Sequence, residues 1–229
     1  MSPKNDPHAL AEMFADMADV FSDSVDLDGL STLLSYCLET AAVDDGTALL
    51  LGEGHQPSLV AGTKGRIDPT AYAMPPVVAR SVRTLHTEVS ITAGTHDVTR
   101  EFAFPLRVRG SALGAVHLCG AQTQKLNDDD LVLLQSIADI AATTIDQTHR
   151  LQQTRSLVAQ LQGALDSRVI IEQAKGILAA RQRTDVSRAF NEIRSIARRE
   201  QRPVRSVASE IVSSVSNQGV AAPGLTTGN

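Results

Sequence analysis

The stretch EFAFPLRVRGSALGAVHLCG, residues 101–120, decides the fold of the first part of this chain. Apolar side chains occupy every second position of its first half, at Phe102, Phe104, Leu106 and Val108. Strict alternation of this kind is typical of a half-buried strand. Arg109-Gly110-Ser111 supplies a turn, and residues 113–119 form the return strand. The stretch therefore predicts an antiparallel β-hairpin.

The segments before this hairpin change from a helical to a strand pattern. Apolar spacings of three and four predict a helix over residues 8–21 and a second one that Asp26 or Asp28 caps and that runs through Thr40. The sequence GTALLLGEGHQPSLVAGT, residues 46–63, predicts two strands around a turn. A short helix over 76–84 and a third strand over 86–91 complete the region. We expect an α+β domain with an antiparallel sheet.

A long helix is predicted after the hairpin. Asn127 is a good N-cap, acidic residues follow it in the first turn, and no helix breaker occurs before Gly163. Apolar residues keep a heptad-like spacing in the second half, at Leu151, Val158, Leu161 and Leu165. This spacing favours a coiled-coil linker over residues 128–162 that joins two copies of the chain. Polar residues at other core positions leave open a helix that packs only on its own domain.

The C-terminal part is basic, whereas the rest of the chain is acidic. Residues 164–216 contain ten basic and six acidic side chains, and residues 1–163 contain eleven basic and twenty acidic ones. Apolar stripes predict three short amphipathic helices, over about 164–182, 186–200 and 204–216, that form a small bundle. The charge indicates either an anionic partner or a solvated arginine-rich surface.

Two known families resemble these two parts. The order of helices, strands, hairpin and long exit helix over residues 8–146 resembles a GAF domain, a small-molecule sensor fold, and residues 102–120 match its hairpin motif. The sequence ALDSRVIIEQAKGILAARQRTDVSRAFNEIRSIARREQRPVRSVASEIV, residues 164–212, resembles an ANTAR domain in order and spacing. The resemblance implies a sensor domain over 8–146 and an ANTAR domain over 164–216. The residue patterns predict a disordered arm over 1–7, the linker helix over 128–162 and a disordered tail over 217–229.

The ANTAR resemblance implies a function. Such domains bind paired stem–loops with six-base loops in nascent messenger RNA and prevent transcription termination, and the family acts as a dimer. Behind a GAF domain, this implies a signal-responsive antitermination regulator that is a homodimer. Its GAF domain either takes a small-molecule ligand, senses a protein or serves mainly for dimerisation. The two cysteines and the lack of a signal peptide predict a cytoplasmic location. A DNA-binding regulator or a signalling scaffold, whose ANTAR domain mediates dimerisation instead of RNA binding, remains the alternative.

Eight residues are the predicted RNA contacts, and all lie on the ANTAR motif or its basic helices: Arg168, Gln173, Ala174, Lys175, Gly176, Arg181, Arg194 and Arg198. Arg168 and Lys175 are seven residues apart and share a helix face, a spacing that suits phosphates along a strand. Arg168 has an alternative, an ion pair with Glu172. Gly176 costs roughly 1 kcal/mol relative to alanine inside a helix. We therefore expect Gly176, and with it the small Ala174, to allow close approach of either RNA or another helix.

The motif departs from the family at Ala179, where methionine is usual, and Phe190 is the only aromatic residue of the domain. Phe190 lies on the apolar stripe, and we expect it in the core. Arginines would then have to supply any stacking of loop bases.

The sensor half gives fewer signals. His117 and Cys119 alternate onto one face of the return strand, where they either line a ligand pocket or are a half-buried histidine beside an inert thiol. Two ligands do not make a zinc site, so we predict no metal and no cofactor.

Several other classes are disfavoured. The chain has no GxSxG, Walker A or HExxH motif and no paired-carboxylate motif, so we do not expect an enzyme. Hairpin strands in the first half argue against a receiver domain, which needs alternating βα units. The two cysteines form no disulfide framework. No signal peptide and no apolar run of about 20 residues is present, so no membrane partner is expected.

Overall fold

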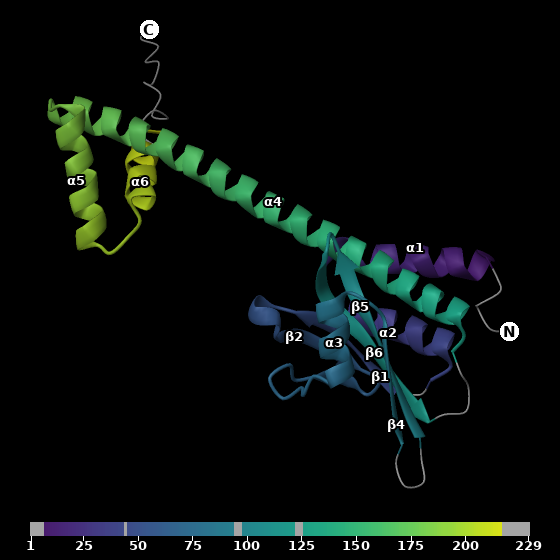
Figure 1. Cartoon of the computed structure of the whole chain (residues 1–229). Coiled ribbons are helices and arrows are strands. Elements are labelled where there is room, and N and C mark those ends of the chain that lie inside the picture. Colours follow the sequence, from purple (N-terminus) through teal and green to yellow (C-terminus); the bar gives the residue numbers. More distant parts are fainter. Residues whose placement is uncertain (1–6, 44, 94–97, 122–125, 217–229) are drawn as a thin grey trace. The chain divides into compact units, whose positions relative to one another are not determined.

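The computed structural model describes residues 7–43, 45–93, 98–121 and 126–216, and Figure 1 labels their elements. The chain divides into two units, Met1–Gln152 and Gln153–Asn229. Each unit is described by itself below. The helix α4 (Asp128–Gln182) begins in the first unit and ends in the second.

An antiparallel sheet forms the centre of the first unit. Its order is β3-β2-β1-β6-β5-β4, and neighbouring strands pair in the antiparallel sense. The strands are β1 (Asp45–Leu51), β2 (Pro57–Gly62), β3 (Gly65–Ile67), β4 (Glu88–Ala93), β5 (Val98–Val108) and β6 (Ser111–Ala121). Phe102 faces Leu118 and Phe104 faces Val116 across β5 and β6. The predicted hairpin and the α+β class are confirmed.

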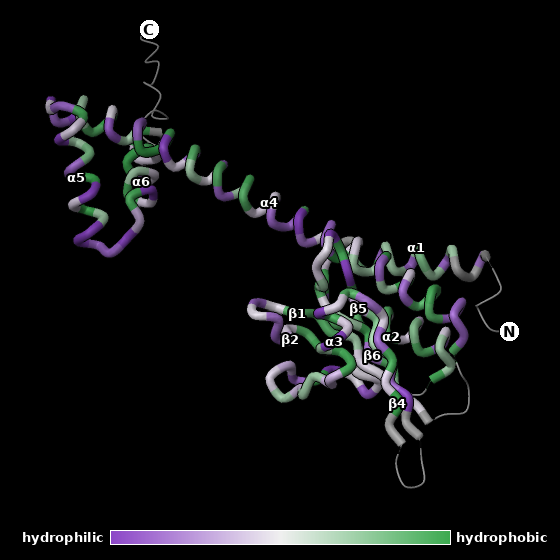
Figure 2. Tube along the Cα trace, in the orientation of Figure 1, coloured by the Kyte–Doolittle hydropathy of each residue, from purple (hydrophilic) through white to green (hydrophobic). Residues whose placement is uncertain are grey.

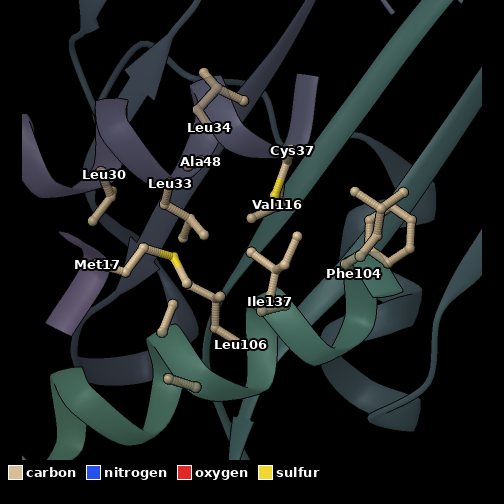
Figure 3. Packing of buried hydrophobic residues seen from close by; sticks show 14 of the residues in the cluster. Met17, Leu30, Leu33, Leu34, Cys37, Ala48, Phe104, Leu106, Val116 and Ile137 are labelled. Atoms are coloured by element: carbon tan, nitrogen blue, oxygen red, sulfur yellow. The ribbon is translucent and has the colours of Figure 1, made fainter. Parts of the chain in front are cut away.

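Three helices cover one face of this sheet. They are α1 (Pro7–Asp23), α2 (Leu27–Ala41) and the first part of α4, and they lie on the opposite side of the sheet from α3 (Pro76–Thr84) (Figure 1). Met17 from α1, Leu33 from α2 and Ile137 from α4 meet Phe104 and Leu106 of β5 in this core (Figure 3). All five side chains are fully buried. Aliphatic side chains and a few phenylalanines therefore build a continuous core without tryptophan.

A smaller core lies on the opposite face of the sheet. Val77 and Val78 of α3 pack there against Leu49, Ala103 and Ala115 from the strands. Because successive strand residues point to opposite faces, the alternation seen in residues 113–119 divides β6 between the two cores. Val116 and Leu118 belong to the larger core, and Ala115 belongs to the smaller one.

Side-chain hydrogen bonds define where the helices begin and how α4 is held. Asp26 caps α2 by accepting from the Gly29 backbone N–H, as one of its two predicted caps. Asn127 accepts from the Asp130 N–H, and the Asp130 carboxylate accepts from the Asn127 N–H, which is a reciprocal cap at the start of α4. In the same helix, Asp139 accepts two hydrogen bonds from Arg107 on β5, at 2.9 and 3.0 Å. These contacts anchor the first part of α4 to the sheet.

The predicted helix boundary at Gly163 is wrong. The helix α4 continues through this residue as one element to Gln182. One glycine costs a helix roughly 1 kcal/mol, and residues that favour helices flank it on both sides, so the penalty is too small to end the helix. The predicted arm also needs correction, because α1 already includes Pro7. Residues 1–6 and the predicted tail over 217–229 lie outside the described residues.

Candidate nucleic-acid interface

The second unit is built around a small core of three helical segments. The end of α4 packs with α5 (Val186–Arg199) and α6 (Val204–Ser216). Five residues of this core are buried: Ala174, Ile193, Ala197, Val207 and Ala208. Asp185 caps α5 by accepting from the Arg188 backbone N–H at 2.9 Å. The predicted amphipathic stripes therefore meet inside the unit, and the basic faces stay outside.

Arg168, Arg181, Arg194 and Arg198 are exposed, as a binding role requires. Arg168 makes no ion pair or hydrogen bond through its side chain with the residues that the structure describes, and the same holds for Arg198. Arg181 donates to the Ser214 hydroxyl at 3.1 Å. The structure does not contain the alternative ion pair between Arg168 and Glu172, because Glu172 contacts a different cation.

That cation is Lys175. Its Nζ lies 2.9 Å from both carboxylate oxygens of Glu172, one helical turn away, and its side chain is 17% exposed. The same Nζ lies 5.3 Å from the centroid of the Phe190 ring. Lys175 is thus a partly neutralised cation that connects α4 with α5, whereas Arg168 is free for an anionic partner.

The prediction for Phe190 is wrong. Its side chain is half-buried, and it does not belong to the buried cluster of the unit or to the hydrophobic residues packed against that cluster. It lies instead between two predicted RNA contacts, because the Arg194 guanidinium carbon is 5.7 Å from its ring centroid and Lys175 approaches it from α4. Both distances fall within the ~6 Å typical of cation–π contacts. The spacing of Phe190 and Arg194 by four residues was the sequence signal for this pair.

The small residues of α4 have different surroundings from one another. Ala174 is fully buried in the three-helix core, so we assign it to helix packing, and its predicted contact with RNA is corrected. Gln173 is exposed. Gly176 is also exposed, and a Cβ added to it would meet nothing within 4 Å. No contact inside the described chain therefore explains the glycine at this position.

Sequence reasoning missed part of the positive surface. Arg183 and Arg205 are exposed and, like Arg168, form no side-chain ion pair or hydrogen bond within the described ranges. Neither residue lies on the family motif, so only their position in a basic segment pointed to them. In contrast, Arg202 is engaged by Glu200 and Glu210.

An open hollow of about 550 Å³ lies where α5 turns into α6. Three arginines line it, Arg194, Arg198 and Arg202, around the apolar side chains of Ala197, Pro203 and Val204. No acidic residue is among its lining residues. Figure 2 shows that the connection between α5 and α6 is hydrophilic. The hollow combines an apolar floor with a cationic rim.

In the first unit, His117 and Cys119 share one face of β6, as expected. His117 is 7% exposed, its Nε2 has no hydrogen-bond partner among the described residues, and Glu101 Oε2 lies 4.0 Å away. Burial lowers the pKa of His117, while Glu101 and Asp45 raise it less. Burial also raises the pKa of the Cys119 thiol, and the charges of Asp45 and Glu101 raise it further. Within the described ranges, no three His, Cys, Asp or Glu residues are placed to hold a metal ion.

Comparison with family models matches both parts of the chain. A GAF domain model matches residues 28–146, and an ANTAR domain model matches residues 159–212. The chain belongs to the GAF–ANTAR family. Both domains are regulatory, and a signal-sensing regulator of the antitermination type fits this pair of domains. A comparison with curated protein sequences found no match.

Solved structures, several of them of GAF domains, are similar to this chain at low identity. The GAF domain of an Acinetobacter phosphoenolpyruvate-protein phosphotransferase is 13% identical, with 63% of this chain and 97% of that chain covered and a TM-score of 0.45. The second GAF domain of DevS from Mycobacterium smegmatis is 13% identical, with 55% and 96% covered and a TM-score of 0.44. Free methionine-R-sulfoxide reductase from Neisseria meningitidis is 14% identical, with 63% and 92% covered and a TM-score of 0.46.

A search of the described helices found none with the length and apolar character needed to cross a membrane.

Proposed function

We propose that this chain is a signal-responsive RNA-binding regulator that acts in the cytoplasm and is not an enzyme. Its ANTAR domain binds tandem stem–loops with six-base loops in nascent messenger RNA and so prevents transcription termination. The observation that carries the proposal is the exposed set of cations on the ANTAR motif, led by Arg168, Arg194 and Arg198. Their side chains make no ion pair with acidic residues of the described chain, so their charge is available to phosphates.

Electrostatics supports an RNA partner for this surface. Each phosphate that a cation neutralises releases counterions, which makes binding favourable and strongly dependent on salt. Arg168 and Arg181 lie on α4, and Arg194 and Arg198 lie on α5, so the positive charge spans two helices. A folded hairpin offers phosphates on two strands, which suits a surface of this kind.

The experiment is a titration of the full-length chain against a tandem hexaloop hairpin RNA, with duplex DNA and a scrambled hairpin as comparisons. We expect selective binding to the hairpin. Arg168→Ala should weaken it about fivefold and lower the salt slope by about one. Arg188→Ala is the matched control, because Arg188 is exposed, lies outside the predicted contacts and pairs with Asp185. Equal binding to duplex DNA would favour the DNA-binding alternative instead.

We also propose that the chain is a homodimer that pairs along α4. Large apolar side chains are exposed on the part of this helix that lies in the second unit, including Leu161, Leu165 and Val169, which are 57%, 64% and 55% exposed. Val158, Leu165, Val169 and Gly176 are separated by seven, four and seven residues, so they share one helix face. A second copy would bury this stripe, and Gly176 would let the two helices approach closely.

Sedimentation of Leu165→Lys tests the dimer. We expect the wild-type chain to be dimeric and the variant to dissociate at least tenfold more readily, because a charge would enter an apolar seam. A variant that remains as dimeric as the wild type would remove α4 from the interface. Dimerisation without RNA binding would favour the scaffold alternative.

For the GAF domain we propose a small-molecule ligand that contacts His117 and lies near Cys119. The support is the unpartnered Nε2 of a buried histidine, since buried polar atoms normally have a hydrogen-bond partner. A ligand with a hydrogen-bonding group would supply one.

A further inference from the structure

We propose that the ANTAR domain reads an unpaired loop base by stacking it on Arg194, which Phe190 holds in position, and that the adjoining hollow between α5 and α6 takes the phosphate beside that base. The inference rests on the proposed function, because it names how the same surface recognises RNA.

The first step of the argument is the position of Phe190. It is the single aromatic side chain of the second unit. An aromatic residue that contributes mainly to stability is expected to pack in the core. Phe190 is half-buried outside that core instead, and two cations from different helices approach its ring, Lys175 at 5.3 Å and Arg194 at 5.7 Å. The ring therefore lies beside the three-helix core and contacts charged side chains at the surface.

The second step concerns Arg194. A guanidinium group is planar and stacks on aromatic faces, and RNA bases stack in the same way on aromatic rings and on arginine planes. Arg194 is exposed and has no acidic partner in the described chain. Contact with Phe190 restricts its side chain before RNA arrives, so less conformational entropy is lost when a base stacks on it. Phe190 thus acts as a positioning residue for Arg194.

The third step is the hollow itself. Its volume of about 550 Å³ lies within the roughly 300–1,000 Å³ that is common for ligand sites. Arg194 belongs to its lining, so a base stacked there would bring its neighbouring phosphate to the cationic rim. Arg202 is already engaged by Glu200 and Glu210. Arg194 and Arg198 are the lining arginines without an ion pair to the described residues, and with Arg194 under the base, Arg198 is placed to meet the phosphate. Ala197 and Val204 in the same lining would contact the sugar that joins this phosphate to the stacked base.

The test uses the full-length chain and a tandem hexaloop hairpin RNA that carries 2-aminopurine at each loop position in turn. The fluorescence of this base analogue depends on stacking with its neighbouring bases, so it should rise at the loop position whose base leaves them for Arg194. A second set of RNAs has an abasic site at each loop position. The variants are Arg194→Lys, which keeps the charge and loses the planar face, and Phe190→Leu, which keeps an apolar side chain and loses the ring. Arg188→Lys is the matched control on the same helix.

We expect Arg194→Lys to weaken binding of the intact loop by about 5- to 50-fold, in the range that base stacking supplies. The same variant should bind the RNA that is abasic at the contacted position within about twofold of the wild type, because no base remains to stack. Its salt slope should not change, since the charge is kept. Phe190→Leu should act in the same direction, with circular dichroism confirming that the helices persist, and Arg188→Lys should behave as the wild type.

The failures of the two proposals are distinguishable. Base stacking at Arg194 is refuted, and the proposed function stands, if the wild-type chain selects the hairpin over the scrambled RNA but Arg194→Lys does not show the expected difference. This is the case if Arg194→Lys binds the hairpin as tightly as the wild type, or if it loses the same affinity for intact and abasic loops. If the wild type shows no selectivity for the hairpin, the proposed function is refuted and this inference with it.

Discussion

Two glycines of this chain, one in each domain motif, have opposite surroundings. Gly114 lies buried on β6, and a Cβ added to it would overlap the backbone carbonyl oxygen of Leu49 on the neighbouring strand. Gly176 lies exposed on α4, and a Cβ added there would meet nothing within 4 Å. The first glycine is required by the fold of its own chain. The second is tolerated at a cost to its helix, and its reason must lie outside the described chain.

The same contrast runs through the two units. The GAF domain keeps its distinctive polar groups inside, as His117 shows, whereas the ANTAR domain places its distinctive groups on the surface around a core of five buried residues. Packing within the chain constrains the residues of a buried site, whereas binding to a partner constrains the residues of a surface site. Substitutions in the first should therefore act on stability, and those in the second on binding.

The largest effect is expected from Gly114→Ala. Its new methyl group overlaps a backbone atom in the middle of the sheet, which cannot move without breaking the β1–β6 ladder. We expect the free energy of unfolding of the GAF domain to fall by about 3 kcal/mol, the upper end of overpacking effects. Urea unfolding followed by circular dichroism measures this. Gly163→Ala, at a helical site with free space, serves as the control. A variant as stable as the wild type would mean that Leu49 has room to shift.

Gly176→Ala tests the exposed glycine on α4. Alanine favours the helix by roughly 1 kcal/mol, and no contact in the described chain opposes it, so the ANTAR domain should become more stable. If RNA or a second copy approaches the helix here, the same methyl group should weaken that association by about tenfold. Gly163→Ala is again the matched control, since it should stabilise α4 without affecting either partner. An unchanged affinity for RNA and an unchanged dimer would leave Gly176 without a binding role.

Most of the fold could be predicted because local patterns determine it. Alternation over residues 102–108 predicted the first strand of the hairpin, and Asn127 predicted the start of α4 at the correct position. The end of that helix could not be predicted from Gly163, because a single glycine is a small penalty that its helical neighbours outweigh. The second core beneath α3 depends on contacts between distant segments, which a pattern along the chain does not reveal.

The candidate RNA surface was predictable as a set of residues, but individual environments were not. Family spacing identified Lys175 and Arg194. The four-residue spacing of Phe190 and Arg194 pointed to their contact, but no spacing predicted that Lys175 would approach the same ring from α4. The reason is that an apolar stripe contains positions at its edge as well as at its centre, and Phe190 is at the edge. Ala174 was misassigned for the converse reason, because a small residue near basic neighbours can equally face the core.

A smaller effect is expected from Glu172→Gln. Glu172 holds Lys175 in an ion pair, whereas Arg168 has no such partner, so Lys175 should contribute less to RNA binding than its position suggests. Removing the carboxylate charge should raise the affinity for hairpin RNA about two- to threefold and steepen its salt dependence. Glu192→Gln removes the same charge from α5, where the carboxylate accepts from Gln182 and holds no cation, and is the matched control. Equal gains from both variants would show that only the net charge matters.

The smallest effect is expected for the pH dependence of the free energy of unfolding that His117 contributes to the GAF domain. Burial lowers the pKa of His117 below its ordinary value of 6.5, and it outweighs Glu101 and Asp45, which raise it. Below pH 6.5 the unfolded chain therefore binds the proton more readily than the folded chain. The stability that neutral His117 contributes is complete above pH 6.5 and declines as the pH falls, by less than about 1.4 kcal/mol for each pH unit.

Urea midpoints of the wild type and His117→Gln, compared between pH 7.5 and pH 5.5, isolate this contribution, because other titrating groups cancel in the difference. We expect the wild type to lose more stability than the variant. The opposite sign would mean that the Glu101 carboxylate, 4.0 Å from Nε2, stabilises the charged imidazole more than burial destabilises it. His117 would then be an ion-pair partner inside the sheet, and the unpartnered nitrogen would no longer support a ligand on this face.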